Sequence, residues 1–526
     1  MGLARTYAVA LAGVTGHLVE VEAYLGGGLP ATILVGLPDT AVREARDRVR
    51  AAMVNSKLGW PDRKITVGLS PAGLPKHGSG FDLAIAIAIL AAWPDAPQYG
   101  ERHQQAPPVA VPPEALFLAE LGLDGRLRPV PGVLPAAVTA TREGKTLIVV
   151  APQNHAEARL VPGARVVAGE CLLDVALWLR GGPQPPAPPA GQAVAEAQAG
   201  PLLPSPKRDL SEVLGQYEAR RAAEICAAGG HNLSLVGPPG AGKTMIAERL
   251  PTILPRLEPA SALEVTSIHS VAGTLRPGAG LITEPPFCAP HHTASMPAIV
   301  GGGSYGVIRP GAASLAHRGV LFLDEAPEFR RDVLDALRQP LEAGEVIIAR
   351  QAMITRFPAR FALVLAANPC PCAKADAGGQ GCECSPATRR RYLARLSGPL
   401  LDRVDVKVRV ERVSRTQMLH DTASAEPSAA VALRVAQARD RAASRLSGTP
   451  WRVNAHVPGA ELRRSFTVPP SALAELDHAM EIGLVSARGA DKIIRIAWTI
   501  ADLEARPRPT RDTVNEALGL WTGAHA

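Results

Sequence analysis

A glycine-rich loop constrains the fold of this chain more than any other feature. It follows an apolar segment at 231–236, precedes a helical pattern, and consists of Gly237, Pro238, Pro239, Gly240, Ala241, Gly242, Lys243 and Thr244. Such a loop turns backbone N–H groups toward the phosphates of a nucleotide, and the following helix directs its positive end at them. Lys243 adds a full charge, and the hydroxyl of Thr244 suits Mg²⁺. The pattern predicts a phosphate-binding loop (P-loop) for a nucleoside triphosphate.

Two carboxylates end the next strongly apolar segment. Val320 to Leu323 reads as a buried strand, and Asp324 and Glu325 follow it directly. This is the Walker B pattern, in which the first acid holds Mg²⁺ through water and the second orients the water that attacks the γ-phosphate. Two solvated acids after a strand would be an adequate alternative in isolation, but the P-loop upstream favours the catalytic interpretation.

Two further polar residues lie where a nucleotide-hydrolysing site needs them. Asn368 ends the apolar segment 360–366 and is positioned to bond the attacking water or the γ-phosphate, although it could simply cap the turn before Pro369. Arg403 lies just before the apolar segment 404–410. From this position its side chain could reach the nucleotide of a neighbouring subunit. Pairing of Arg403 with a nearby aspartate is the structural alternative.

The chain divides into four segments by composition and periodicity. Residues 1–180 alternate strand and helix signals and predict an α/β domain, and 181–204 form a Pro/Ala-rich linker. Residues 205–410 predict a parallel sheet with crossover helices around the P-loop, and 411–526 show only helical periods. The predicted fold class is therefore α/β, with a C-terminal helical domain. A chain of 526 residues is also too long for a single core.

The composition sets limits on location and partners. The net charge of +7 permits a polyanionic partner without requiring one. No apolar run reaches the ~18 residues of a membrane span, the best being the predicted buried helix at Leu83 to Trp93. The N-terminus lacks a signal-peptide pattern, so we expect a cytoplasmic protein without membrane association.

Four of the seven cysteines form two closely spaced pairs. They are Cys370, Cys372, Cys382 and Cys384, with a Gly-rich loop between the pairs. Four thiolates can close a tetrahedral zinc site, although the usual spacing within a pair is two residues. The alternatives are a structural Zn²⁺ site and reduced thiols around an ordered loop.

Several short motifs give the chain a family resemblance. These are Ile268–Gly273, Ala289–Ser295, Val300–Ser304, Arg309–Gly311, Ser314–His317, Asn368–Cys372 and Ser397–Asp405. Together they resemble the magnesium-chelatase-like AAA+ ATPases of the ComM/YifB group, nearly from end to end of the chain. The resemblance implies ATP as the nucleotide, a hexameric ring, and an N-terminal domain like those of Lon-type peptidases and ribosomal protein S5. It also implies branch migration of DNA in natural transformation, with recombination proteins as possible partners.

The same resemblance assigns roles to further residues. Glu345 to Phe357 looks like a pore hairpin and Ala272 to Arg309 like an insertion, so that Arg350, Arg356, His291 and His292 become candidates for phosphate contacts along a DNA strand. Arg488 resembles the sensor 2 arginine of the helical lid, which reaches the γ-phosphate. The sequence departs from the family at Cys288 and Trp498, where relatives often carry arginine.

Two other regions invite a functional interpretation. Leu74 to Asp82 resembles the nucleophile segment of Lon-like peptidases, but Gly80 stands at the serine position and no lysine occurs between Lys76 and Lys145, which predicts a non-catalytic domain. The lid is rich in arginine, namely Arg434, Arg439, Arg441, Arg445, Arg452, Arg463 and Arg464. This indicates either a nucleic-acid surface or an ordinary solvated face.

Three functional hypotheses follow. The first is an ATP-driven ring motor that moves along single-stranded or branched DNA, hydrolysing ATP with Lys243, Glu325, Asn368, Arg403 and Arg488. The second is a chelatase-type motor that acts on a protein partner, against which the N-terminal domain argues. The third is an ATP-gated scaffold or protein-remodelling ATPase that does not translocate DNA.

Overall fold

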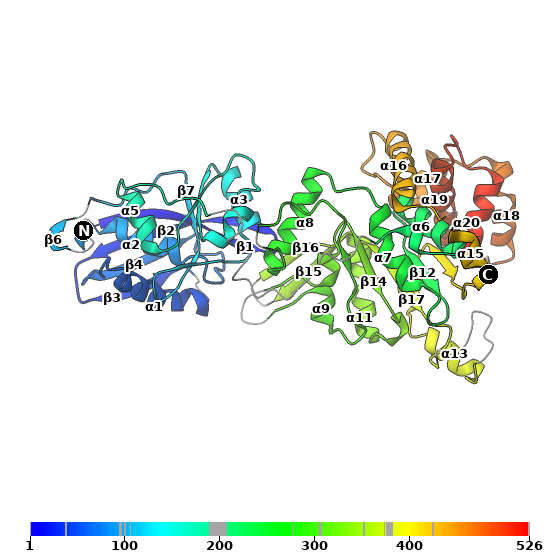
Figure 1. The fold of residues 1–526 in the computed structure, drawn as a ribbon, viewed down its shortest axis with the longest axis horizontal. Helices are drawn as coiled ribbons and strands as arrows, with labels where there is room; N and C mark the ends of the chain where they lie inside the picture. Colours follow the sequence, from blue (N-terminus) through cyan, green and yellow to red (C-terminus); the bar gives the residue numbers. More distant parts are fainter. Residues whose placement is uncertain are drawn as a thin grey trace.

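The computed structural model describes residues 2–36, 39–93, 97–98, 101–105, 107–188, 208–276, 278–303, 308–350, 353–372, 374, 382–422 and 425–523. Most of the predicted linker at 181–204 lies outside these residues. The molecule is elongated, with the N-terminal α/β elements at one end, the P-loop sheet in the middle and the C-terminal helices at the other end (Figure 1). None of the described helices is both long enough and apolar enough to cross a lipid bilayer.

The N-terminal elements form two sheets. The first has the order β1-β2-β4-β3, in which β1 and β2 make a long antiparallel hairpin and β3 pairs with β4 in parallel. Its strands are β1 (Gly2–Ala12), β2 (Thr15–Gly26), β3 (Ala31–Val35) and β4 (Lys64–Ser70). The second sheet is parallel, with the order β11-β10-β7. It consists of β7 (Ala115–Leu118), β10 (Leu147–Val150) and β11 (Arg165–Ala168).

Helices bury the apolar faces of these two sheets. The predicted buried helix is confirmed as α2 (Asp82–Ala92), which is apolar on all sides because it is enclosed by β1, β2 and β7. The other N-terminal helices are α1 (Thr40–Asn55), α3 (Val133–Arg142), η1 (Pro152–Asn154), α4 (His155–Ala158) and α5 (Leu172–Leu179). The minor strands are β5 (Pro97–Gln98), β6 (Glu101–Gln105), β8 (Glu120–Leu121) and β9 (Leu127–Arg128).

A five-stranded parallel sheet carries the P-loop. Its order is β13-β14-β17-β12-β18, and each pair of neighbours is parallel, which confirms the predicted parallel sheet. The strands are β12 (Leu233–Val236), β13 (Phe287–Cys288), β14 (Val320–Leu323), β17 (Ala362–Ala367) and β18 (Val406–Arg409). Parallel strands aligned in this way end at one common edge, so the residues that follow them are brought together.

Short helices and one hairpin surround this sheet. The hairpin predicted at 345–357 is confirmed as β15 (Glu345–Arg350) and β16 (Met353–Pro358), with Val346 opposite Phe357. The larger helices are α6 (Tyr217–Gly229), α7 (Lys243–Ile253), α8 (Pro259–Ala272) and α13 (Pro386–Leu393). The smaller ones are η3 (Leu210–Glu212), α9 (Met296–Val300), α10 (Ala312–Leu315), η4 (Ala326–Glu328), α11 (Arg331–Ala336), α12 (Arg338–Ala343) and α14 (Gly398–Leu401).

The C-terminal segment is helical, as predicted. The four expected helices are α16 (Ser428–Arg445), α18 (Pro470–Glu481), α19 (Ala487–Leu503) and α20 (Arg511–Thr522). The structure adds α15 (Arg415–Thr422), η5 (Asn454–His456) and α17 (Gly459–Arg464), whose shortness hides their period. Side chains of α16, α19 and α20 share one hydrophobic core with α6, α7 and β12. The lid is therefore packed on the P-loop sheet rather than separate from it.

The N-terminal elements contact the P-loop segment through α3 and α8. The backbone N–H of Gly132 donates to the carbonyl of Ser270 at 3.1 Å, and the hydroxyl of Ser270 donates to the carboxylate of Glu157. Burial raises the pKa of this Glu157 carboxyl, although its three hydrogen bonds oppose the shift. The β1–β2 turn lies against the hairpin, because a Cβ on Gly13 would come within 2.4 Å of the carbonyl oxygen of Arg356.

Candidate nucleotide-binding site

The P-loop lysine is held by the strand ends around it. Lys243 is 7% exposed, and its ammonium donates to the carbonyls of Gly237 at 2.7 Å and Pro238 at 2.9 Å. A third bond of 3.0 Å goes to the Oδ1 of Asn368, which follows β17. Burial lowers the pKa of Lys243, and the charges of Asp324 and Glu325 oppose that shift. The lysine and the amide predicted to act together therefore lie in direct contact.

The loop itself has the geometry of an anion cradle. Gly240 and Gly242 have φ values of +75° and +96°, and a Cβ on either would meet no atom within 4 Å. Only glycine adopts this backbone readily, and the open space beside it is where phosphate oxygens would be accommodated. Gly242 leads directly into α7, whose first residue is Lys243. The arrangement fits a nucleotide bound at the N-terminus of α7.

Thr244 and Asp324 form a hard oxygen pair suited to Mg²⁺. The hydroxyl of Thr244 donates to the Oδ2 of Asp324 at 2.9 Å, although 80 residues separate them in the chain. Oxygen ligands of this kind, with water and phosphate completing the octahedron, are the usual environment of Mg²⁺. These two residues would hold the ion, whose chemistry is to neutralise charge on the phosphates.

Glu325 lies in an unusual backbone conformation next to this pair. Its φ of 49° and ψ of 43° are left-handed, which is uncommon for a residue with a side chain and marks a constrained turn. The carboxylate is half exposed and pairs with His292 at 3.1 Å. The ring of His291 lies 4.1 Å from that of His292. The insertion expected to contact DNA thus brings His292 to the Walker B glutamate, a role that the sequence did not reveal.

Arg403 lies at the opposite edge of the sheet from the P-loop. It precedes β18, so it belongs with the N-terminal ends of the parallel strands, whereas the P-loop follows the C-terminal end of β12. Asn232 fixes this edge by donating to the carbonyl of Arg403 at 2.7 Å and accepting from the N–H of Leu363 at 2.8 Å. The guanidinium pairs with Glu342, and not with Asp402 or Asp405 as the structural alternative had it.

Arg488 lies on the same edge as Arg403. It is exposed in the first turn of α19, one turn before Lys492. Lys492 donates to the carbonyl of Val404 at 3.0 Å and pairs with Asp405 at 3.1 Å. Further along α19, Thr499 bonds His231 at 2.8 Å. Helix α19 therefore lies along the N-terminal edge, and the two candidate arginines are on the side away from their own P-loop.

The four clustered cysteines, called here the thiol cluster, consist of Cys370, Cys372, Cys382 and Cys384. None of the four is in a disulfide, and their sulfur atoms lie within 4.8 Å of one another. The Sγ of Cys372 is 3.1 Å from that of Cys370 and 3.4 Å from that of Cys382. The hydrogen bond with Cys370 is the main cause that lowers the pKa of Cys372 to about 6. The cluster has the ligand number and spacing of a site that could hold a metal.

Most of the candidate nucleic-acid arginines of the lid are engaged within the chain. Arg434 pairs with Glu224 and Glu426, both at 2.7 Å, and Arg445 pairs with Asp502. Arg439 is bonded to the carbonyl of Ala227, and burial lowers its pKa to about 10. These contacts favour the structural interpretation for this part of the lid. In the β15–β16 hairpin, Arg356 pairs with Glu345, and the side chain of Arg350 lies outside the described residues.

Of the two departures from the family, Trp498 is buried and Cys288 is partly buried. Trp498 donates from Nε1 to the carbonyl of Phe466 at 3.0 Å and stacks under Arg445, 4.3 Å from the ring centre. Cys288 lies in β13, and burial raises the pKa of its thiol to about 12. These side chains pack the core, and neither offers a charge to DNA.

The peptidase-like segment of the N-terminal region contains no assembled dyad. Lys76 is fully buried and donates to the carbonyl of Pro71, while Ser79 donates to Glu120. Serine and lysine thus each bond a different partner, and the non-catalytic role of this segment stays a prediction.

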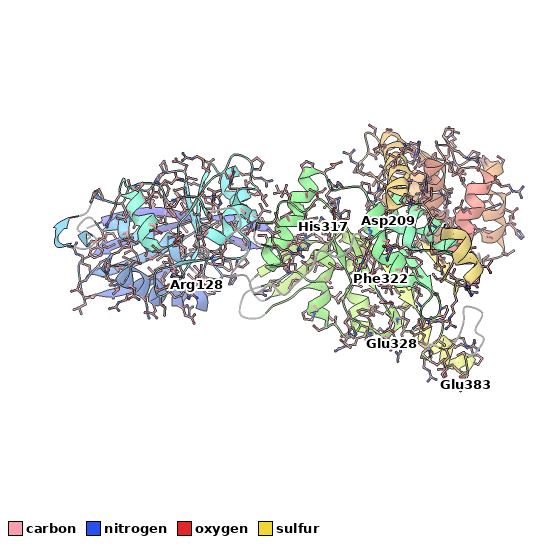
Figure 2. The ribbon with its side chains drawn as sticks, in the orientation of Figure 1. Arg128, Asp209, His317, Phe322, Glu328 and Glu383 are labelled. Carbon is pink, nitrogen blue, oxygen red and sulfur yellow. The ribbon has the colours of Figure 1, made fainter. Side chains whose placement is uncertain are left out.

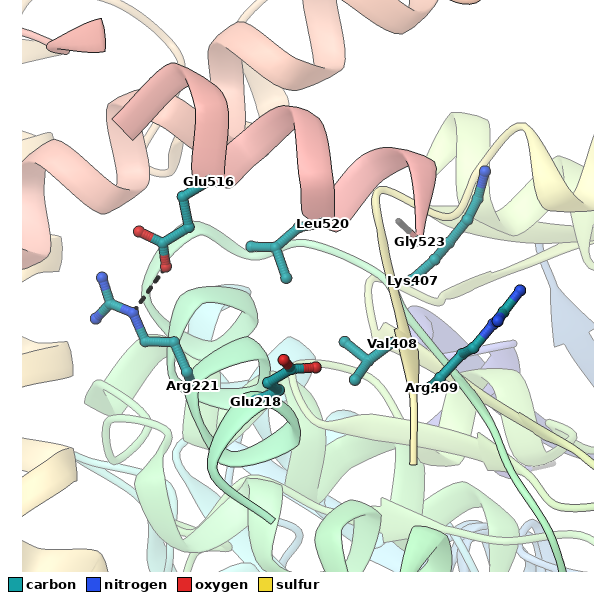
Figure 3. Close-up of a pocket in the computed structure, with 8 residues that line it drawn as sticks. All are labelled: Glu218, Arg221, Lys407, Val408, Arg409, Glu516, Leu520 and Gly523. Atoms are coloured by element: carbon teal, nitrogen blue, oxygen red, sulfur yellow. Dashed lines mark hydrogen bonds and ion pairs between the residues drawn. The ribbon is translucent and has the colours of Figure 1, made fainter. Parts of the chain in front are cut away.

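A separate small cavity lies beside the edge strand β18. It has a volume of about 160 Å³ and lies between α6, the edge strand β18 and α20. Its lining includes Leu520 and Val408, together with Arg221 and Glu516, which form an ion pair of 3.0 Å. Figure 3 marks this pair with a dashed line. No P-loop residue lines it, so it is distinct from the nucleotide-binding site.

Family models match three segments of the chain. Residues 209–418 match the magnesium chelatase subunit ChlI model, 21–154 a second model for subunit ChlI of Mg-chelatase, and 425–520 the ChlI C-terminal model. The 38 kDa magnesium-chelatase subunit of Rhodobacter capsulatus is 28% identical over 236 residues, which cover 42% of this chain and 62% of that protein.

Other relatives match along their whole length. An uncharacterized protein of Mycobacterium tuberculosis is 49% identical over 525 residues, covering 100% of both chains. The competence protein ComM of Haemophilus influenzae is 41% identical over 99% of this chain and 97% of its own. YifB of Escherichia coli is 39% identical over 98% and 97% respectively.

These matches extend across the P-loop, the thiol cluster and the lid, in the order that the structure places them. The chain therefore belongs to the magnesium-chelatase-like family of AAA+ ATPases, and within it to the ComM/YifB group.

Proposed function

We propose that this protein is an ATP-hydrolysing ring motor that translocates on single-stranded or branched DNA. The proposal rests on one observation. The residues predicted to bind the nucleotide lie at one edge of the sheet, and the two candidate arginines lie at the opposite edge. At the C-terminal edge Lys243 bonds Asn368, and Thr244 bonds Asp324. Arg403 and Arg488 lie at the N-terminal edge, where they can serve only another copy.

In the proposed reaction each residue has a defined task. Lys243 and the loop N–H groups bind the β- and γ-phosphates, and Thr244 and Asp324 hold Mg²⁺. Glu325 orients and polarises the attacking water, and Asn368 positions that water against the γ-phosphate. The bond between Lys243 and Asn368 makes phosphate binding and water positioning parts of one unit.

The two arginines require an oligomer. Arg403 would neutralise the charge that develops on the γ-phosphate of the neighbouring subunit, and Arg488 would contact the same nucleotide from the lid. Each copy then contributes its arginines to one neighbour and receives those of the other. This contact is head to tail, the kind that builds a ring when the rotation between copies closes. A hexamer is the ring size that the family resemblance implies.

The choice of DNA as substrate rests on relatives and on charge. The name of the H. influenzae relative assigns it to competence, a process that handles DNA. A net charge of +7 is compatible with a polyanion, and the β15–β16 hairpin is the candidate element for contacting a strand in the pore. A chelatase-type motor is less favoured, because the chelatase relative covers only 42% of this chain.

The proposed cofactors are ATP and Mg²⁺ at the P-loop. Zn²⁺ is the proposed occupant of the thiol cluster, since four thiolates are typical of structural zinc.

The deciding experiment is the steady-state ATPase rate with and without forked DNA, for the wild type and Lys243→Ala. DNA stimulation that Lys243→Ala abolishes, together with strand displacement or branch migration, would support the motor. Hydrolysis indifferent to every DNA, with no strand moved, would refute it in favour of a protein-directed ATPase.

A further inference from the structure

The thiol cluster occupies a particular place between the nucleotide-binding site and a projecting helix. Its first member, Cys370, follows Asn368 by two residues and is fully buried. Its last member, Cys384, precedes Ser385, whose hydroxyl caps α13 by accepting the N–H of Thr388 at 3.2 Å. A metal bound here would therefore join the turn after β17 to the start of α13.

The C-terminal end of α13 contacts the turn that follows Glu325. Arg395, just after α13, pairs with Glu328 at 3.0 Å, and Glu328 belongs to the turn η4 that follows Glu325 directly. Tyr392 of α13 is buried, and burial together with the charges of Glu328 and Glu325 raises its pKa to about 12. The segment thus links the turn of Asn368 with the turn of Glu325.

Most described residues of α13 face solvent. Figure 1 shows α13 at the lower margin of the molecule, away from the sheet. Figure 2 places Glu383, which lies between Cys382 and Cys384, at the same margin, with Glu328 nearer the sheet. Residues 386–391 of α13 are exposed except for the half-buried Arg389. A small exposed segment without a core of its own is the kind of structure that a metal commonly stabilises.

The sulfur geometry suits Zn²⁺. Bonds of about 2.3 Å in a tetrahedron place the four sulfurs about 3.8 Å apart. The thiols already lie within 4.8 Å of one another, so binding requires only small side-chain adjustments. The backbone N–H of Cys384 donates to the Sγ of Cys382 at 3.3 Å, an outer contact that orients a ligand sulfur and moderates its charge.

We propose that the thiol cluster is a structural Zn²⁺ site that holds the turn of Asn368 and helix α13 in one unit, and thereby supports the hydrolysis step. The inference rests on the proposed ATPase function. The cysteines are positioning residues, since they act on the reacting groups through Asn368. Loss of the metal should leave nucleotide binding largely intact, because the carbonyls of Gly237 and Pro238 still hold Lys243.

The first test is the metal content of the full chain, purified under reducing conditions without added zinc. About one Zn²⁺ per chain is expected, and replacement by Co²⁺ should give the visible spectrum of tetrahedral thiolate ligation. Less than half an equivalent, or disulfide-linked cysteines by mass spectrometry of the intact protein, would overturn the site. The metal content does not depend on ATPase activity, so this measurement tests the zinc site even if the proposed function is wrong.

The second test separates positioning from folding. Cys384→Ser should lower zinc content and reduce kcat by about tenfold or more, with a smaller change in the affinity for a fluorescent ATP analogue. Cys384→His, which restores a zinc ligand, should recover much of the rate. Cys171→Ser is the matched control, since Cys171 lies at the start of α5, far from the cluster in the chain, and serine also caps a helix.

A double-mutant cycle with Asn368→Ala completes the design. If the cluster acts through Asn368, the kcat losses of Cys384→Ser and Asn368→Ala should be strongly less than additive. Additive losses, or an equal loss of ATP affinity in Cys384→Ser, would refute the positioning role while leaving the zinc site itself intact.

Discussion

Lys243 and Asn368 meet at 3.0 Å between Nζ and Oδ1, and this contact joins the P-loop after β12 to the end of the neighbouring strand β17. The ammonium also binds two carbonyls of the loop, so it is held before any phosphate arrives. Such preorganisation reduces the rearrangement needed at the moment of reaction. Asn368 is thereby tied to the state of the phosphate site.

The first prediction concerns Asn368→Ala. Removing the amide takes away a positioning group but leaves the lysine with its carbonyl partners, so kcat should fall by roughly 10- to 100-fold, with a smaller change in KM. Steady-state ATPase assays measure both constants. A KM increase with kcat unchanged would mean that Asn368 only assists binding, and Lys243→Ala provides the reference for lost phosphate binding.

The second prediction concerns Glu325→Gln. The glutamine keeps the size of the side chain but can no longer polarise water, so hydrolysis should drop by about 100-fold or more while ATP binding is retained. Nucleotide binding by fluorescence and turnover by phosphate release give the two quantities. Glu284→Gln is the control, because Glu284 is an exposed acid that pairs only with Arg256 at 3.7 Å. Normal turnover in Glu325→Gln would assign the base to another group.

Whether a residue of this site could be predicted from the sequence depends on whether it belongs to a local sequence pattern. The P-loop, Asp324 and Asn368 each follow an apolar strand, and the parallel sheet brings strand ends together, so their meeting could be predicted. His292 comes from a loop with no strand or helix period, and its pairing with Glu325 depends on tertiary packing. Lys492 lies four residues after Arg488, and its bond to the carbonyl of Val404 depends on how α19 packs on the sheet, which no local pattern predicts.

The surroundings of the lid arginines, by contrast, could not be predicted from the sequence. Their density suggested a nucleic-acid surface, but composition alone cannot distinguish a charge that faces solvent from one that pairs across an interface. In the structure α16 packs on α6, so Arg434 meets Glu224 and Arg439 meets the carbonyl of Ala227 near the C-terminal end of α6. Glu224 lies 210 residues upstream of Arg434 in the chain.

The third prediction concerns the acid sensitivity of Asp405. Burial alone would raise its pKa, but the contact with His231 and the charge of Lys492 at 3.1 Å outweigh burial and lower the pKa to about 2. Because the unfolded value is near ~3.9, the folded state binds fewer protons, and this stabilisation is present above pH ~4 and lost as the pH falls toward ~2. It amounts to at most roughly 2 to 3 kcal/mol.

Urea unfolding between pH 6 and pH 2.5 measures this effect. Wild type should be more stable than Asp405→Asn at pH 6, and the difference should shrink as the pH approaches 2.5. A difference that stays constant over this range would show that the charge of Asp405 is not what stabilises the edge. Asp62→Asn, at an exposed loop position, is the control for general acid effects.

The last prediction tests whether Arg403 acts in trans. Arg403 lies on the edge of the sheet opposite its own P-loop, so Arg403→Ala should bind ATP normally but lose about 10³-fold in turnover, as expected for a missing arginine finger. Lys243→Ala should be inactive for a different reason, since it lacks the phosphate lysine but keeps Arg403. Mixing the two inactive proteins should restore activity, because some interfaces then combine an intact P-loop with an intact arginine. Arg452→Ala, an exposed arginine of the lid, should be fully active alone. Failure of the mixture to recover activity, with mixed oligomers demonstrated by a tag pull-down, would place the action of Arg403 within its own subunit and refute the shared site.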